Sequence, residues 1–452
     1  MELSPELIYE EYSKNILDKN AATKLLISLI ENSENEKVRV SSINQLNHIG
    51  VTDKKAFKVM ENLLISDSND SIRNAAAIVL RDNYLEDSLE PMKWALNHEE
   101  SLSCLDTVYL SLVKILNYYV MSSDPLTKAI LLTELERINH NEFKIGFEIL
   151  RETREGKQFS KTELANLLIN YFTMVYLEKS FWRLKFKIEN CEIVELDFIF
   201  KGLSSIPEAL KYLSSLKILI LRYNQLTKLP NWIKKLDCLE VLNVNVNSLN
   251  QLSDSIGELK NLKELLLWQN ELNYLPNPIG NLKNLEILNL RLNQIKELPS
   301  SIGKLSSLKE LNLHDNQLIW LPDSIGSLNK LEILNLSWNC IKALPESLGE
   351  LTKLKTLDLE RNELVSLPEN IGSLSSLKYL NLSDNKLKII PESIGKLTSL
   401  QYLNISRNEL ENIPRTIESI TSLKDLCIAE NNMRFIPKYL KNLEQKGINV
   451  VY

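Results

Sequence analysis

Hydrophobic residues in the second half of the chain recur in a fixed order with a period of 23 residues. One copy runs from Leu331 to Leu351 and follows the pattern LxxLxLxxNxLxxLPxxIGxL. Its Leu-x-Leu pair has the period of two of a short strand, so both leucines point to one side. The asparagine stands where the chain must turn off that strand, and its amide can bond to backbone groups freed in its own copy and the next. Each copy therefore predicts one strand, an asparagine turn and a short helical return.

The asparagine keeps this period ten times without a slip. The predicted structural turn residues are Asn224, Asn247, Asn270, Asn293, Asn316, Asn339, Asn362, Asn385, Asn408 and Asn431. A proline follows six residues after each of them except Asn247, where Ser253 stands instead. Such a period is typical of a solenoid, whose stacked copies share a core that no single copy can form. The fold class expected for this half is an α/β solenoid.

The LPxxIGxLxxLxxLxLxxNxL unit resembles the leucine-rich repeats of the plant intracellular Ras-group-related proteins and of Ras-binding scaffolds of the Shoc2/Sur-8 type. The resemblance covers roughly residues 196–440. It implies a leucine-rich-repeat horseshoe with a concave parallel sheet, and a small GTPase or another signalling protein as partner. Because the matching residues are the structural ones, no GTPase-contacting residue is carried over.

Both ends of the array depart from the unit in ways that predict edge strands. The segment from Trp182 to Glu189 alternates apolar and charged residues, and the divergent unit after it has Lys201 in place of the asparagine. The segment from Gly447 to Tyr452 is expected to add a last strand. Atypical terminal units cover core leucines that would otherwise be exposed. The leucine-rich repeat domain with its caps is predicted over residues 181–452.

Residues 1–180 are predicted to be all helical. Two stretches that begin at Asn35 and Asn69 repeat each other, and their arginines, Arg39 and Arg73, stand 34 residues apart. A capping residue followed by Val/Ile-Arg resembles the second helix of HEAT-like repeats. We therefore expect HEAT-like repeats over 1–120 and a helical connector over 121–180. In the connector, the segment Ser160-Lys-Thr-Glu has the spacing of a capping box.

Composition excludes several classes of protein. Residues 1–184 hold 21 Lys and Arg against 28 Asp and Glu, and the remainder holds 32 against 31. Neither part has the basic balance of a nucleic-acid binder. No apolar run approaches the ~20 residues that span a bilayer, and the acidic start does not resemble a signal peptide. Five widely spaced cysteines fit reduced thiols, so a cytoplasmic protein is expected.

No constellation for catalysis or metal binding stands out, so no catalytic residue, metal ion or cofactor is predicted. The segment that starts at His98-Glu99 begins like the zinc motif HExxH, but Leu102 stands where the second ligand must be. The Gly303-Lys304 and Gly395-Lys396 pairs lack the upstream glycine and the hydroxyl of a phosphate-binding loop. The chain therefore favours recognition over catalysis.

Candidate binding residues stand two and one positions before the turn asparagines, where we expect them inside the strands and pointing out from the concave sheet. Late copies hold Ser383-Asp384 and Ser406-Arg407 there, whereas earlier copies hold large aromatic and charged residues of the types enriched at binding hot spots. The alternative is that these are scattered surface residues. The predicted partner-binding residues are Arg222, Tyr223, Trp268, Arg291, His314, Asp315, Trp338, Glu360 and Arg361.

Two further columns flank this patch. Tyr379 and Tyr402 are expected to extend it. A second set of asparagines, four residues before the turn asparagines, is expected to form a side-chain ladder. Its members are Asn289, Asn312, Asn335, Asn381 and Asn404.

The pattern favours a non-catalytic scaffold or adaptor in signal transduction, which holds a folded protein on its concave face. Two other classes stay open. A secreted or host-directed effector could use the same horseshoe, and cell fractionation would distinguish it. An enzyme with lyase-like activity in the helical segment is the other, since some HEAT-like proteins resemble bilin lyases, and a chromophore soak would test it. The sequence predicts neither the partner's identity nor the oligomeric state.

Overall fold

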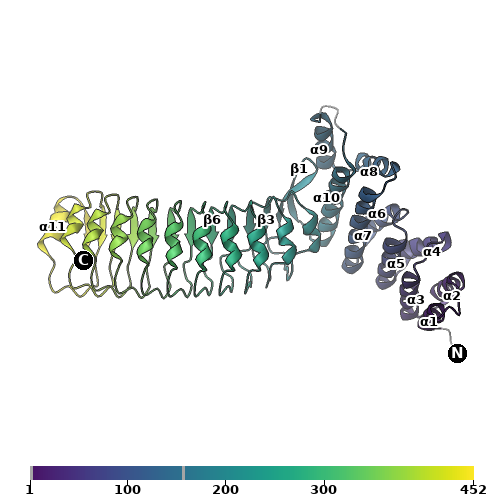
Figure 1. Cartoon of the computed structure of the whole chain (residues 1–452), viewed down its shortest axis with the longest axis horizontal. Coiled ribbons are helices and arrows are strands. Elements are labelled where there is room, and N and C mark those ends of the chain that lie inside the picture. The colour runs from purple at the N-terminus through teal and green to yellow at the C-terminus, as the bar shows by residue number, and fades with distance from the viewer. Residues whose placement is uncertain (1–3, 155–157) are drawn as a thin grey trace. The chain divides into compact units, whose positions relative to one another are not determined.

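The computed structural model describes residues 4–154 and 158–452 of the chain. The chain divides into two compact units, residues 1–193 and 194–452. The first is mostly helical and ends with strand residues, and the second is built from a long row of strands (Figure 1). The finer boundaries predicted at residues 120 and 180 stay a prediction.

Ten α-helices occupy the described part of the first unit. Asn35 and Asn69 accept hydrogen bonds from backbone N–H groups at the starts of α3 and α5, as their positions before Val/Ile-Arg predict. The capping box of Ser160 and Glu163 is present at the start of α10. The helices are α1 (Pro5–Ser13), α2 (Lys19–Asn32), α3 (Glu36–Ile49), α4 (Lys54–Ser66), α5 (Asp70–Asn83), α6 (Leu89–His98), α7 (Leu102–Met121), α8 (Leu126–Arg137), α9 (Asn141–Glu152) and α10 (Lys161–Ser180).

These helices pack as successive pairs. Helix α2 packs on α3, α4 on α5 and α6 on α7, while α3, α5, α7 and α10 pack on one another in a second layer. Figure 1 shows them stacked in chain order. The arrangement is consistent with the HEAT-like segment expected from the sequence.

The two repeated arginines have equivalent structural roles. Arg39 of α3 donates to Asp67, which follows α4, and Arg73 of α5 donates to Glu99, which follows α6. Each arginine therefore ties the second helix of one pair to the loop inside the next. Because Glu99 is almost fully buried, its charge requires the guanidinium beside it.

The second unit is an open solenoid with one strand in each coil. The described residues form a thirteen-stranded sheet in chain order, and the printed pairs from β2 to β13 are all parallel. The strands are β1 (Lys185–Glu189), β2 (Glu192–Asp197), β3 (Ile218–Ile220), β4 (Val241–Asn243), β5 (Glu264–Leu266), β6 (Ile287–Asn289), β7 (Glu310–Asn312), β8 (Ile333–Asn335), β9 (Thr356–Asp358), β10 (Tyr379–Asn381), β11 (Tyr402–Asn404), β12 (Asp425–Cys427) and β13 (Asn449–Val451). Strands β1 and β13 are the outermost, as the edge strands of the sequence pattern predict.

A proline and a short 3-10 helix return the chain on the opposite side of each coil. Their N-cap residues are the prolines of the repeat, with Ser253 in its one exception. The 3-10 helices are η1 (Glu208–Tyr212), η2 (Asn231–Lys235), η3 (Asp254–Glu258), η4 (Asn277–Asn281), η5 (Ser300–Lys304), η6 (Asp323–Ser327), η7 (Glu346–Glu350), η8 (Glu369–Ser373), η9 (Glu392–Lys396) and η10 (Arg415–Ser419). Helix α11 (Lys438–Gln445) replaces the 3-10 helix in the last coil.

The turn asparagines join neighbouring coils. In the coil of Asn316, the amide nitrogen donates to the carbonyls of Leu313 (3.1 Å) and Leu290 (2.9 Å), and the amide oxygen accepts from Ile295 N–H (3.0 Å). Leu290 and Ile295 belong to the preceding coil, so the expectation of a contact with the next coil is wrong in direction. The amide is buried and satisfies three backbone groups that would otherwise lack partners.

Backbones meet where the 3-10 helices stack. A Cβ added to Gly326 would lie 2.4 Å from the carbonyl oxygen of Ser347 in the next coil. This distance is far below van der Waals contact, so the glycine is required by the spacing of the coils. The Ile-Gly-x-Leu corner is thus a packing element.

Candidate functional site

Side chains of the strands point alternately into the core and to the solvent. In β7, Leu311 is fully buried while Glu310 and Asn312 are half-buried on the opposite side. We use the name sheet face for the surface formed by the side chains that stand six, four, two and one positions before each turn asparagine. The first two of these positions lie on the strand and the last two lie in the turn after it. The prediction that the candidate binding residues lie inside the strands is therefore wrong, because every repeat strand ends four residues before its asparagine.

In seven of the ten repeat strands β3–β12, the last residue is Asn or Asp, and its side-chain oxygen stabilises this early turn by accepting from the N–H group two residues on. The Oδ1 atom of Asn335 accepts hydrogen bonds from Ser337 N–H (3.0 Å) and Ser337 Oγ–H (2.6 Å), two residues further on. Asn381 and Asn404 do the same with Ser383 and Ser406. These are Asx turns inside one coil. The expected ladder of asparagines between coils is wrong, since their oxygens bond locally.

The residue before each turn asparagine has a left-handed backbone. Its φ angle lies between 51° and 59° in all ten coils, including Val246 and Trp338. A side chain other than glycine costs on the order of 1 kcal/mol in this conformation. Asp315 and Asp384 are of the type that tolerates it best, whereas the larger residues are kept there at a cost in stability.

The most exposed aromatic residue among the candidates is Trp338, with 43% of its surface exposed. The Arg361 guanidinium lies 4.0 Å from the Trp338 ring centroid, and the Arg361 Nε atom donates to Asp384 at 3.1 Å. On its other side, Trp338 lies 6.1 Å from the His314 ring. The structure thus brings three predicted residues from three consecutive coils into one cluster.

The protonation of His314 follows from its hydrogen bonds. The Asn335 amide oxygen can only accept, so the Ser337 hydroxyl hydrogen is directed to it. The 2.7 Å contact between His314 Nδ1 and Ser337 Oγ must then be donated by the histidine. Burial and the nearby Arg291 charge lower the pKa of His314 below its usual value. The neutral ring therefore carries its proton on Nδ1 and presents Nε2 as an acceptor.

Trp268 and Arg291 form a second cluster on the same face. The Arg291 guanidinium lies 6.0 Å from the Trp268 ring centroid. Trp268 is only half exposed, and its Nε1 atom is buried without a hydrogen-bond partner in the described chain. Part of this indole therefore supports the coil, which separates it from the exposed Trp338.

Arg222 and Tyr223 lie apart from these clusters, beside a residue that the sequence pattern did not single out. Phe200 is 72% exposed, and its ring stacks on Tyr223 with centroids 4.5 Å apart. The sequence pattern did not mark Phe200 as a candidate, because the divergent first coil lacks the asparagine from which the positions are counted. Asp315 and Glu360 are half-buried on the sheet face. The role of all nine candidates in binding stays a prediction.

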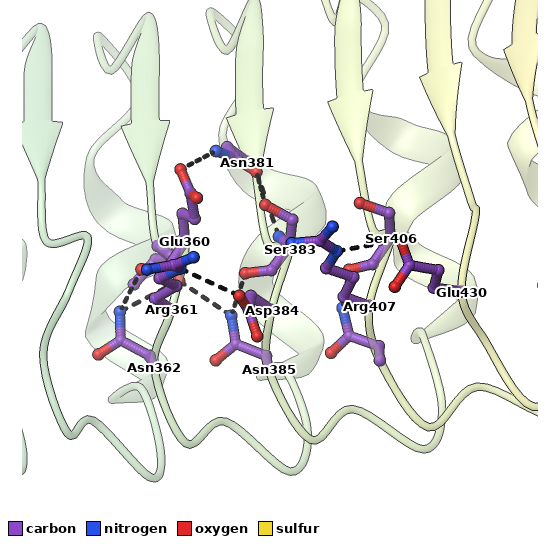
Figure 2. Close-up of polar contacts among 12 residues, drawn as sticks. Glu360, Arg361, Asn362, Asn381, Ser383, Asp384, Asn385, Ser406, Arg407 and Glu430 are labelled. Carbon is purple, nitrogen blue, oxygen red and sulfur yellow. Dashed lines mark hydrogen bonds and ion pairs between the residues drawn. The ribbon is translucent and has the colours of Figure 1, made fainter.

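The last coils hold charged residues that form ion pairs between coils, although the sequence analysis did not count Asp384 and Arg407 among the candidate binding residues. Arg361 binds Asp384, and Arg407 binds Glu430, each at 3.1 Å and each 23 residues apart (Figure 2). In the sequence, these pairs could have been found as opposite charges that stand one repeat period apart. Next to them, the rings of Tyr379 and Tyr402 stack with centroids 4.6 Å apart and planes 3° from parallel.

Two searches of the described residues were negative. They contain no group of three or more His, Cys, Asp or Glu side chains arranged to hold a metal ion. None of the helices in residues 4–154 and 158–452 is long and apolar enough to cross a membrane.

Comparison with known families decides what the repeats are. The model of the leucine-rich repeat region matches residues 261–338 and 368–445. Two further leucine-rich repeat models match residues 321–364 and 215–236. The repeats are leucine-rich repeats. The narrower resemblance to Ras-group-related proteins and Shoc2/Sur-8 stays a prediction.

Several solved structures are similar to part of this chain. A TDR receptor is 31% identical, with a TM-score of 0.52, over 57% of this chain and 46% of the receptor. A leucine-rich repeat protein of Leptospira interrogans is 29% identical over 56% of this chain and 82% of its own, with a TM-score of 0.34. The ectodomain of the Arabidopsis receptor kinase HAESA is 30% identical over 54% of this chain and 43% of its own, with a TM-score of 0.48. The chain therefore spans less than half of both receptor structures. No curated protein matches the chain.

Proposed function

We propose that the protein is a non-catalytic scaffold whose leucine-rich repeats hold a folded protein partner on the sheet face. The observation that carries this proposal is the position of Trp338. Its indole is exposed, lies between His314 and Arg361, and occupies a left-handed backbone position that disfavours large side chains. A tryptophan there does not contribute to the leucine core, so it is available to a partner.

The size and composition of the face support the proposal. Ten coils at about 4.8 Å spacing give a surface on the order of 50 Å long. An interface of about 1,600 Å² fits on such a surface. The Trp and Arg residues along it are the types that supply most binding energy in protein interfaces. Leucine-rich repeats generally mediate protein–protein interactions, and a solved structure that matches with a TM-score of 0.52 is of a receptor.

The partner class that we propose is a small GTPase or another signalling protein. This part rests on the resemblance of the repeat unit to Ras-binding scaffolds. No GTPase-contacting residue of those scaffolds is matched in this chain. A scaffold role in signal transduction follows from that partner class.

Site-specific photocrosslinking tests the proposal. A photoreactive benzoylphenylalanine in place of Ile333 lies on the sheet face, where the isoleucine is 39% exposed. The matched control is the same substitution of Ile389, which is 66% exposed but stands four residues after a turn asparagine. We expect a protein adduct from position 333 and not from position 389. Adducts from position 389 alone would overturn the proposal.

A further inference from the structure

Both borders of the sheet face hold ion pairs between neighbouring coils. At the starts of the strands, Lys263 binds Glu240, Lys309 binds Glu286 and Lys355 binds Glu332, at 2.5–2.6 Å and one coil apart. At the opposite border, Arg361 and Arg407 bind the acids of the following coils. These pairs are therefore satisfied before any partner arrives.

Five other carboxylates of the sheet face have no such cations. No ion pair within 4 Å joins the side chains of Glu264, Glu310, Asp315, Asp358 or Glu360 to another described residue. From β5 to the turn after β10, the sheet face holds these five acids and the paired Asp384, against only Arg291 and Arg361. The centre of the face is thus acidic, although the whole unit is nearly neutral.

One coil shows this departure most clearly. Its neighbours hold Asn and Ser at the strand end and two residues on, and the serine hydroxyl donates to the asparagine oxygen in the coils of Asn335, Asn381 and Asn404. In the coil of β9 these positions are Asp358, at the strand end, and Glu360, in the turn after it, and both are acceptors when ionised. Asp358 still accepts from Glu360 N–H at 3.1 Å, so the turn is kept, but the side-chain bond is lost.

The surroundings of these two acids supply little compensation. The amide nitrogen of Asn381 donates to Glu360 at 3.4 Å, as Figure 2 shows. Burial, together with the Glu360 charge, raises the pKa of Asp358 above its usual value. Lys378 stands at the strand-start border of the next coil, without an ion pair in the described chain. A half-buried carboxylate beside a like charge is stabilised by a cation brought from outside.

Aromatic rings beside the acids suit the same type of ligand. Tyr379 and Tyr402 present a flat stacked pair on the two following strands. The contact between Arg361 and Trp338, at 4.0 Å, shows that this face already holds a guanidinium against an aromatic ring. A long cationic side chain can place its aliphatic stem on the tyrosines and its charge at the carboxylates.

We propose that the sheet face over β7–β11 docks a partner segment rich in lysine or arginine, with one cationic side chain between Asp358, Glu360 and Tyr379. This inference rests on the proposed function and specifies the chemistry of the partner. The positive charges of the segment complement the acids that the chain leaves without cations. The ion pairs at the borders contact the partner without binding its charges.

The test uses the whole chain, immobilised, and a phage library of random peptides about twelve residues long. We expect the enriched peptides to contain more lysine and arginine than the starting library. Their affinity should fall about tenfold for Asp358→Asn/Glu360→Ser. This variant gives the coil the Asn and Ser of its neighbours, so it keeps the turn. Its binding should also depend less on salt than that of the natural chain, which should weaken between roughly 50 mM and roughly 500 mM NaCl.

The matched control is Glu286→Gln/Glu332→Gln, which removes two charges from the border where both are paired. It should retain the affinity for the selected peptides within about twofold. Enrichment of acidic or uncharged peptides, an absence of enrichment, or equal binding by the Asp358→Asn/Glu360→Ser chain would overturn the inference. Photocrosslinking at position 333 remains independent of partner charge, so an acidic partner captured there would support the scaffold and refute the basic segment.

Discussion

The guanidinium of Arg361 lies 4.0 Å from the Trp338 ring centroid while its Nε atom is held by Asp384 at 3.1 Å. Arg361 thus binds a carboxylate through its Nε atom, while its guanidinium group covers an exposed indole. The contact connects three coils of the solenoid on the side where the strands end (Figure 2 shows Arg361 and Asp384). It holds Trp338 in one orientation before a partner binds.

This contact predicts coupling between the two side chains in binding. Arg361→Ala should weaken the partner's affinity by about 1 kcal/mol, because the indole loses its fixed orientation and its cation–π contact. The double variant with Trp338→Ala should bind no more weakly than Trp338→Ala alone, and calorimetry with the crosslinked partner would measure both. Additive losses would show that Arg361 acts separately from the tryptophan.

Loss of a turn asparagine should lower stability. Asn316→Ala removes the amide that satisfies the backbone groups of Leu290, Leu313 and Ile295, so the free energy of unfolding should fall by about 1–3 kcal/mol. Chemical denaturation measures this change. The control is Asn329→Ala, since Asn329 is exposed. An equal effect of the two substitutions would contradict the role of the buried amide.

A methyl group at the coil contact should also be costly. Gly326→Ala places a Cβ atom against the Ser347 carbonyl, and relief of this overlap should lower the free energy of unfolding by about 2 kcal/mol. Ser327→Ala, one residue further on and exposed, is the control. A Gly326→Ala protein as stable as the natural chain would mean that the coils can separate without loss.

The helical unit should be destabilised by acid through Glu99. Burial alone would raise the pKa of Glu99, but the hydrogen bonds from Arg73, Cys104 and the Ser101 N–H, together with the Arg73 charge, outweigh it and lower the pKa to about 2 from an ordinary value of 4.5. A lowered pKa in the folded state stabilises the fold above about pH 4.5, and that stability is lost as the pH falls toward about 2. The protection factors of α5 and α7 amides, obtained from hydrogen exchange in the full chain relative to the intrinsic rate at each pH, should therefore fall over this range.

Glu99→Gln isolates that effect. It should lower the stability of the helical unit by about 3 kcal/mol at neutral pH, because Arg73 is left without its carboxylate. It should also remove much of the dependence on pH between about 4.5 and about 2. Glu178→Gln, at an exposed position of α10, serves as the control. Exchange rates that respond equally to both substitutions would argue against the ion pair.

Much of the fold is predictable because most coils have the same structural residues. The leucines require a shared core, the asparagine satisfies the backbone groups of the turn, and the glycine permits close stacking. The ten copies therefore all predict the same coil. Sequence patterns also placed the edge strands and the helix caps at Asn35 and Asn69. The strands were predicted too long. Every strand from β3 to β12 ends after three residues, including β3 and β5, which end in the apolar residues Ile220 and Leu266 and so lack the Asx turn seen at Asn335.

The candidate site was less predictable because it depends on side-chain orientation. The 23-residue spacing was enough to place Trp338 and Arg361 in neighbouring coils, but it did not show that Arg361 would also bind Asp384. Trp268 and Trp338 occupy nearly equivalent positions, yet one indole nitrogen is buried and the other ring is exposed. Phe200 was missed because its coil lacks the asparagine that marks the others.

The most direct test of the sheet face as the working surface compares two tryptophans. Trp338 is 43% exposed on this face, and Trp320 is 50% exposed at a position four residues after a turn asparagine. Calorimetry with the partner captured at position 333 should give a Kd about thirtyfold weaker for Trp338→Ala, or about 2 kcal/mol, and within about twofold of the natural value for Trp320→Ala. A larger loss for Trp320→Ala, or no loss for Trp338→Ala, would contradict the account.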